Sequence, residues 1–231
     1  MPSVLITGAN RGLGLELSRQ YAADGWRVFA CCRDPEGAGP LHDVAGDAPG
    51  AVSVHPLDVT DHRRVDALAR ELHDQPLDLL LNNAGVYGPR KMVLGQLDYR
   101  AWEQVLAVNV LAPVKMAEAF FKHVAASQRK VIACLSSALG SVGGNTSGRH
   151  YLYRTSKAAL NAAVKSLAID LRPLGVTAVA LHPGWVRTDM GGEDADLAPA
   201  DSARAVRQVI DRLNLDDSGK FLSYDGSLIA W

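Results

Sequence analysis

Short apolar runs alternate with longer segments of helical periodicity from one end of the chain to the other. The apolar runs are nearly continuous, which is typical of parallel strands that are buried on both faces. They predict strands at residues 3–7, 27–32, 51–59, 77–85, 130–137, 176–184 and 220–226. Apolar positions spaced by three and four residues predict helices at residues 12–24, 61–74, 99–126, 153–172 and 199–213. Segment 34–50 is rich in Gly, Pro and Asp, so any helix there is expected to be short.

The regular alternation of strand and helix predicts the α/β class, because each strand–helix–strand unit favours parallel strands. We predict a single domain over residues 1–231, built as a doubly wound, mostly parallel seven-stranded sheet with helices on both faces. No internal repeat or low-complexity linker divides the sequence. Ligands of such sheets bind beyond the carboxyl ends of the strands.

Composition and charge exclude several classes of partner. Apolar residues make up 48% of the 231 residues and charged residues 21%, with a net charge of −1. This balance provides no electrostatic field for nucleic acid and no basic stripe for a membrane surface. No apolar run approaches the ~20 residues of a membrane span, and the N-terminus lacks the basic region and cleavage site of a signal peptide. We expect a cytoplasmic protein that binds neither nucleic acid nor membrane.

The cysteines and histidines point to no metal site. Cys31, Cys32 and Cys134 lie in apolar stretches without metal-ligand spacing, so they are expected to be buried, reduced thiols. The seven histidines form no HxxxH or HExxH pair. We therefore expect no bound metal.

The first predicted strand runs directly into TGANRGLG at residues 7–14 and then into a helix. Gly8, Gly12 and Gly14 would allow a tight turn, close approach of the backbone to a pyrophosphate, and close packing of the helix on the sheet. The helix N-terminus offers free N–H groups and the positive end of its dipole to the phosphates. The turn predicts a dinucleotide site, although methyltransferases share a related turn.

A second motif, YRTSK, places Tyr153 and Lys157 four residues apart on one face of the predicted helix. Taken alone, this spacing is common among surface residues. Together with the GxxxGxG spacing of the glycine turn, it resembles the short-chain dehydrogenase/reductase family, in its single-domain Rossmann-fold branch. Further segments match the family pattern in chain order, namely LDVTD (57–61), NNAG (82–85), VNVLAP (108–113), LSSALG (135–140) and HPGWVRT (182–188). The ending YDGSLIAW resembles the C-factor-like and sniffer-like carbonyl reductases within the family.

The resemblance implies an NAD(P) site and a catalytic site built from these motifs. The residues expected to contact the cofactor are Gly8, Asn10, Arg11, Gly12, Leu13, Gly14, Arg33, Asp58, Val59, Asn83, Ala84, Gly85, Tyr153, Lys157, Pro183, Gly184, Val186 and Thr188. Among them, Asp58 would meet the adenine, and the 182–188 segment would surround the nicotinamide. The implied catalytic residues are Asn109, Ser137, Tyr153 and Lys157.

The chemistry of carbonyl reduction explains why Tyr153 and Lys157 would stand together. Hydride transfer to a carbonyl leaves an alkoxide that needs a proton. A tyrosine with its ordinary pKa of about 10 exchanges protons poorly at neutral pH, and an ammonium one helical turn away should lower that pKa. We therefore expect Tyr153 to act as the acid/base, tuned by Lys157, which by resemblance also holds the nicotinamide ribose. Alcohol oxidation would use the same residues, so the direction stays open.

Two further residues would complete the catalytic site. Ser137 is expected to hydrogen-bond the substrate oxygen where charge develops. The adjacent Ser136 is the alternative, and the Ser-x-x-Gly frame that ends at Gly140 favours Ser137. By resemblance, Asn109 would anchor the water through which protons pass from Lys157 to solvent.

Cofactor choice depends on the end of the second strand, in VFACCRDP. NAD-dependent folds of this type place an acidic residue there to hold the ribose 2′-hydroxyl. Here the neutral Cys32 takes that position, Arg33 follows it, and Asp34 comes one residue too late. Arg11 in the glycine turn is a second cation for a 2′-phosphate. We predict NADP(H) rather than NAD(H), with the alternative that either arginine is an ordinary surface residue.

The sequence specifies the substrate-binding part of the site less well than the cofactor-binding part. A short loop at about residues 189–199 stands where many relatives carry a long lid, and the conformation of loop 141–152 is open. We expect a small-molecule carbonyl or alcohol as substrate. Candidate pocket residues are Gly143, Gly144, His150, Tyr151, Trp185 and Met190, of which Trp185 could equally be a core residue.

The helices predicted at 99–126 and 153–172 are apolar on more than one side, which is typical of helices that are buried on most sides. The sheet covers one face of each, so we expect a homodimer or homotetramer joined through these helices. The alternative is that both are core helices of a monomer.

The alternative function is a non-catalytic NAD(P)-binding sensor on the same fold; such proteins typically lose the Tyr or the Lys, and both are present here.

Overall fold

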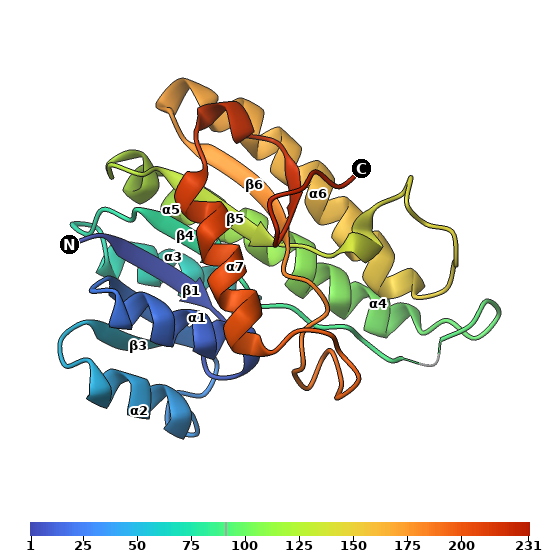
Figure 1. Cartoon of the computed structure of the whole chain (residues 1–231), viewed down its shortest axis with the longest axis horizontal. Helices are drawn as coiled ribbons and strands as arrows, with labels where there is room; N and C mark the ends of the chain where they lie inside the picture. The colour runs from blue at the N-terminus through green and yellow to red at the C-terminus, as the bar shows by residue number, and fades with distance from the viewer. Residues whose placement is uncertain (91) are drawn as a thin grey trace.

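The computed structural model describes residues 1–90 and 92–231, and its centre is a seven-stranded sheet in the order β3-β2-β1-β4-β5-β6-β7 (Figure 1). Every pair of neighbouring strands is parallel. The strands are β1 (Ser3–Thr7), β2 (Arg27–Cys32), β3 (Val52–Pro56), β4 (Leu79–Asn82), β5 (Val131–Leu135), β6 (Thr177–His182) and β7 (Phe221–Ser223). The chain builds outward from β1 in one direction and from β4 in the other, so the switch point lies between these two strands.

Helices cover both faces of the sheet, which confirms the predicted doubly wound architecture (Figure 1). One face carries α1 (Gly12–Ala23), α2 (Gly39–Asp47) and α7 (Pro199–Arg212), and the other carries α3 (His62–Glu71), α4 (Tyr99–Leu106), α5 (Ala112–Ala125) and α6 (Tyr151–Leu171). Successive strand residues alternate between the two cores: Ile6 packs with α1 and α7, whereas Leu5 packs with α5 and α6. Burial on both faces explains why the strands are continuously apolar.

The helix predicted at 99–126 is a composite. A π-helical turn, Ala107–Leu111, joins α4 to α5, and its one-residue widening brings Asn109 to the interior. The whole run, Tyr99–Ala125, is 27 residues long and apolar enough to cross a membrane by length and composition, a test that core helices also pass. Met116, Phe120 and Val124 are buried in the core beside α3 and α6, and this packing accounts for part of the apolar composition.

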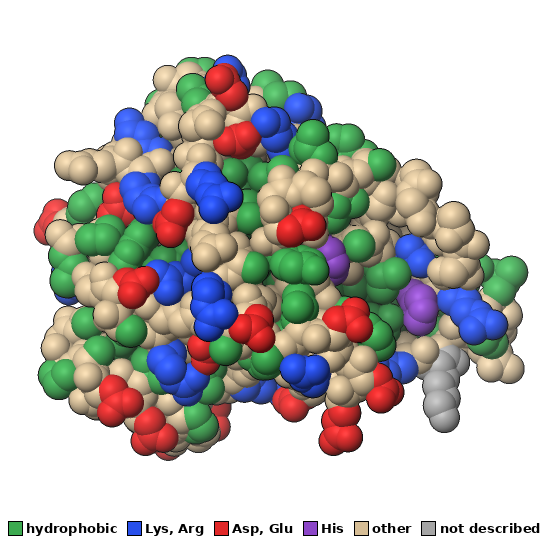
Figure 2. Space-filling view, viewed as in Figure 1, with side chains coloured by type: hydrophobic (Ala, Val, Ile, Leu, Met, Phe, Trp, Pro, Cys, Tyr) green, Lys and Arg blue, Asp and Glu red, His purple; other side chains and the backbone are tan. Residues whose placement is uncertain are grey.

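Charged side chains of both signs are interspersed over the face that carries α1, α2 and α7 (Figure 2). The view shows no large area of one sign, in line with a net charge of −1. Toward the right of this view, where the loops that follow the strands lie, polar and apolar side chains are mixed on the surface (Figures 1 and 2).

Candidate active site

The glycine turn between β1 and α1 has the backbone that its sequence predicts. Gly8 has φ 66° and Gly12 has φ 54°, in the left-handed region that favours glycine. A Cβ on Gly14 would lie 2.2 Å from the Gly8 carbonyl oxygen, so no larger residue fits there. Arg11, the residue before α1, makes no side-chain cap hydrogen bond within the described parts of the chain. The first N–H groups of α1 are therefore available to an anion.

The segment after β4 is tied to the glycine turn by hydrogen bonds. Asn83 Nδ2 donates to the carbonyl oxygens of Thr7 at 2.7 Å and Gly8 at 3.1 Å. The N–H groups of Asn83 and Ala84 both donate to Thr7 Oγ1 at 3.0 Å. The NNAG segment therefore stabilises the glycine turn through these hydrogen bonds. Thr7 is a partner that the sequence reasoning missed.

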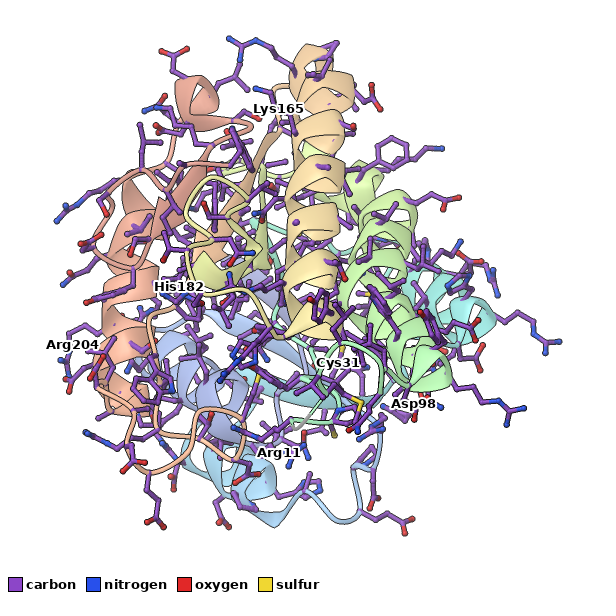
Figure 3. All side chains as sticks on the ribbon, turned by 90° about the vertical axis from the view of Figure 1, so that its right-hand side faces the viewer. Arg11, Cys31, Asp98, Lys165, His182 and Arg204 are labelled. Carbon is purple, nitrogen blue, oxygen red and sulfur yellow. The ribbon has the colours of Figure 1, made fainter. Side chains whose placement is uncertain are left out.

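The part of the cofactor site where a 2′-phosphate is expected contains two exposed cationic side chains. Cys32 is buried, and Arg33 lies beyond the end of β2 near Asp58. Hydrogen bonds from Thr60 lower the pKa of Asp58, and Arg33 lowers it further. Arg11 pairs with Asp189 of the substrate loop at 2.7 Å, with both side chains largely exposed. Figure 3 looks onto this edge and shows Arg11 between the start of α1 and the loop after β6.

The segment after β6 lies beside the glycine turn. Gly184 has φ 85°, and a Cβ on Gly12 would lie 3.3 Å from Thr188 Cγ2. Thr188 Oγ1 donates to the Val186 carbonyl at 3.3 Å, and the Pro183 carbonyl accepts from Ser202 at 2.6 Å. The residues expected around the nicotinamide are therefore held next to the start of α1.

Tyr153 and Lys157 share one buried face of α6, as their spacing predicts. Lys157 Nζ lies 5.6 Å from the centre of the Tyr153 ring and donates to the Leu135 carbonyl at the end of β5, at 2.8 Å. Ser137 follows β5 directly and begins the short 3-10 turn Ala138–Gly140, where Ser137 Oγ accepts from the Leu139 N–H at 3.2 Å. The expected acid/base, lysine and serine are brought together.

The electrostatics of this group differ from the expectation. Burial raises the pKa of Tyr153 to about 12, and a hydrogen bond with Ser137 offsets part of that rise. The expected lowering by Lys157 is therefore wrong for this structure. Burial also lowers the pKa of Lys157, to about 8, because the charged form loses its hydration. The ammonium faces the Leu135 carbonyl and the Tyr153 ring, so it stabilises the phenolate less than the spacing alone suggested.

The structure separates the two candidate serines. Ser136 Oγ donates to Asn161 Oδ1 at 2.6 Å and lies in the interior. Ser137 is the serine whose side chain lowers the pKa of Tyr153 by hydrogen bonding, partly offsetting the effect of burial. This arrangement supports Ser137 over Ser136.

Asn109 holds the segment that follows NNAG. Its Oδ1 accepts from the Val86 N–H at 2.9 Å, and its Nδ2 donates to the Val86 carbonyl at 2.8 Å and to Ser156 Oγ at 3.0 Å. A Cβ on Gly85 would lie 3.3 Å from Asn109 Oδ1 and 3.6 Å from Lys157 Nζ. The asparagine side chain therefore links this loop to α6, a role that the sequence did not indicate.

An aromatic side chain that the sequence reasoning missed covers Tyr153. The Tyr87 ring stacks on the Tyr153 ring with centres 4.4 Å apart, and Tyr87 Oη hydrogen-bonds His150 Nδ1 at 3.0 Å. A narrow pocket beside them is lined by Tyr87, Pro89, Arg90, Met92, His150, Tyr151, Leu152 and Tyr153. His150 and Tyr151 thus line a pocket as expected.

The other expected pocket residues lie elsewhere. The Gly143 N–H donates to the Trp231 carbonyl at 2.9 Å, so Gly143 contacts the C-terminal segment, and the Gly144 N–H donates to Ser141 Oγ at 2.9 Å. Trp185 is half exposed rather than a core residue, and its Nε1 donates to the Gly191 carbonyl at 2.9 Å. Met190 lies in the same loop, where its carbonyl accepts from Arg90.

Comparisons with known proteins agree with this geometry. Residues 2–197 match the family model described as short chain dehydrogenase. The C-signal protein of Myxococcus xanthus is 44% identical over 165 residues, which cover 71% of this chain and 99% of that protein. The carbonyl reductase Sniffer of D. melanogaster is 38% identical with a TM-score of 0.93 and full coverage of both chains. The NADPH-bound carbonyl reductase from chicken fatty liver is 34% identical with a TM-score of 0.92, covering 100% of this chain and 99% of that one.

Proposed function

We propose that this chain, which belongs to the short-chain dehydrogenase family, is an NADP(H)-dependent oxidoreductase that transfers a hydride between the nicotinamide and a carbonyl or secondary alcohol. The observation that carries the proposal is the buried group of Tyr153, Lys157 and Ser137 at the sheet edge that also holds the glycine turn. The similarity to carbonyl reductases, one of them NADPH-bound, supports the same reaction class.

The residues at this edge fit a dinucleotide. The steric requirement for glycine at position 14 and the uncapped first turn of α1 leave the backbone open to a pyrophosphate. Arg33 and Arg11 would hold a 2′-phosphate, and Asn83 to Gly85 would lie along the cofactor. When bound, the cofactor supplies or accepts the hydride.

In the reduction direction, Tyr153 is the proton donor. A pKa of about 12 keeps the phenol protonated at neutral pH, so its proton is available to the oxygen that becomes an alkoxide. Ser137, whose side chain already influences the pKa of Tyr153, would donate to the same oxygen as charge develops on it.

Lys157 supports this proton transfer from one helical turn away. With a pKa of about 8 it remains mostly protonated at neutral pH and can return a proton toward Tyr153. We keep Asn109 as the proposed anchor of the proton path to solvent, in addition to its hydrogen bonds to Val86.

One experiment separates the enzyme from a non-catalytic sensor. Loss of NADPH absorbance is followed with a reactive diketone such as diacetyl, for the wild type and for Tyr153→Phe. We expect turnover only by the wild type, with similar NADPH affinity for both, because the lost hydroxyl acts on protons. NADPH binding without consumption by the wild type would favour the sensor, and substantial activity of Tyr153→Phe would contradict the mechanism.

We also propose a cytoplasmic homodimer or homotetramer joined through the α4–α5 run and α6. Leu111 and Ile169 are large apolar side chains on these helices that remain more than half exposed. Light scattering at micromolar concentration should show a particle larger than the 24.7 kDa chain. A monomer would contradict this assembly.

A further inference from the structure

Helix α6 carries a third buried polar side chain, one turn after Lys157. Tyr153, Lys157 and Asn161 follow at intervals of four residues, so they lie on one face of the helix. Asn161 is 2% exposed, and it belongs to none of the motifs that identify the catalytic site. An amide at this depth costs stability unless protein partners replace its hydrogen bonds to water.

Both ends of the Asn161 amide bind the segment that carries Ser137. Ser136 Oγ donates to Asn161 Oδ1 at 2.6 Å, and Asn161 Nδ2 donates to the Gly140 carbonyl at 3.4 Å. These two contacts lie on either side of Ser137 in the chain. The Gly140 N–H donates back to the Ser137 carbonyl at 2.7 Å. Asn161 therefore binds both ends of the turn from Ser136 to Gly140. We call its two hydrogen bonds to this turn the Asn161 clamp.

Packing alone does not fix this turn. On its inner side, a Cβ on Gly140 would lie 2.8 Å from Lys157 Cβ and 3.1 Å from Asn161 Nδ2, so the turn is in close contact with α6. Beside the turn and along α6 lies a groove of about 450 Å³, lined by Gly140, Val142, Ala158, Asn161, Ala162, Lys165 and Trp231. Because the turn borders open space on this side, the hydrogen bonds to Asn161 hold it in place where packing would do so in a filled core.

We propose that Asn161 is a positioning residue for the reaction, which sets the place of the Ser137 hydroxyl relative to Tyr153; this inference rests on the proposed function. Without the amide, the Ser136 hydroxyl and the Gly140 carbonyl lose their partner, and the turn relaxes to hydrate them. A displacement of about 1 Å at a reacting group can lower the rate about a hundredfold. The loss is bounded by the effect of removing the Ser137 hydroxyl itself, about a hundredfold or more.

The first test uses Asn161→Leu, which keeps the branching and the number of side-chain heavy atoms, although its methyl groups are bulkier, and removes both hydrogen bonds. We expect kcat with NADPH and diacetyl to fall roughly tenfold to a hundredfold, with an unchanged Kd for NADPH, because Ser136 and Gly140, which Asn161 binds, are not among the residues expected to contact the cofactor. Val164→Ala is the matched control: Val164 is fully buried on the same helix, and its truncation costs stability by leaving a cavity. It should keep kcat within about twofold. Equal losses of kcat in the two variants would overturn the proposal.

A double-mutant cycle tests whether Asn161 acts through the serine. In the Ser137→Ala background, Asn161→Leu should lower kcat by less than about twofold further, because the group that it positions is already absent. The full single-mutant loss in that background would show an independent role and overturn the proposal.

Amide hydrogen exchange tests the clamp without any turnover. The Gly140 N–H should exchange faster in Asn161→Leu than in the wild type, and Val164→Ala should leave it unchanged. Unchanged exchange at Gly140 in Asn161→Leu would overturn the clamp. The expected change in exchange, together with a wild type that reduces no carbonyl, would instead overturn the proposed function.

Discussion

Replacing Lys157 by methionine changes how protein stability depends on pH, because it removes a buried ammonium and keeps most of the aliphatic chain. Lys157 is 5% exposed, and its single hydrogen bond in the described residues goes to the Leu135 carbonyl. Burial lowers its pKa from 10.5 to about 8. The folded protein therefore holds this proton less tightly than the unfolded chain does.

The shift sets both the size and the sign of the effect. It corresponds to about 3 kcal/mol of unfavourable interaction for the charged form, at 1.36 kcal/mol per pKa unit. Between pH 8 and pH 10.5 the unfolded state binds more protons, so wild-type stability rises as pH rises through this window. The Lys157→Met variant lacks this contribution. The wild type should gain about 2 kcal/mol relative to the variant between pH 7 and pH 9.5.

The assay is urea unfolding of both proteins at several pH values across that range, with the free energy of unfolding extrapolated to water. Other titrating groups are common to both proteins and cancel in the difference. A difference that stays constant with pH would show that Lys157 keeps an ordinary pKa in the folded state. That result would remove Lys157 as a low-pKa proton source for Tyr153.

Four further substitutions test the other parts of the site. Gly14→Ala should abolish NADPH binding in a fluorescence titration, because the new Cβ would clash with the Gly8 carbonyl oxygen at 2.2 Å; binding at wild-type affinity would contradict the proposed site. Ser137→Ala should lower kcat by about two orders of magnitude or more, whereas Ser136→Ala should lower it less; the reverse order would assign the oxyanion contact to Ser136. Arg33→Ala should raise the Kd for NADPH about tenfold to a hundredfold and leave the Kd for NADH nearly unchanged, because it removes one hydrogen bond to a charged group. Equal losses of affinity for both cofactors would refute the selection of NADP(H) by Arg33.

Local periodicity predicted the fold, whereas the resemblance to the short-chain dehydrogenase/reductase family, through motifs in chain order, identified the main side-chain group. Buried strands are continuously apolar, and a four-residue spacing places Tyr153 and Lys157 on one helix face whatever surrounds them. The glycine turn was equally predictable, since the requirement at Gly14 is a backbone contact within the motif itself.

Other features depend on contacts between distant segments. The pKa of Tyr153 follows from its depth and from the direction of the Lys157 ammonium, neither of which the spacing specifies. Tyr87 belongs to no motif and reaches Tyr153 only through the path of its loop. The pairing of Arg11 with Asp189 joins residues 178 positions apart.

Isotope labelling of the cofactor follows the transferred hydride itself. The wild type is given a carbonyl substrate and NADPH that carries deuterium at the transferable position of the nicotinamide, and the product alcohol is examined by mass spectrometry. One deuterium is expected on the carbinol carbon with the wild type, and no labelled alcohol with Tyr153→Phe. Alcohol formed without deuterium on that carbon, with cofactor deuterated on either face of the ring, would contradict hydride transfer at this site.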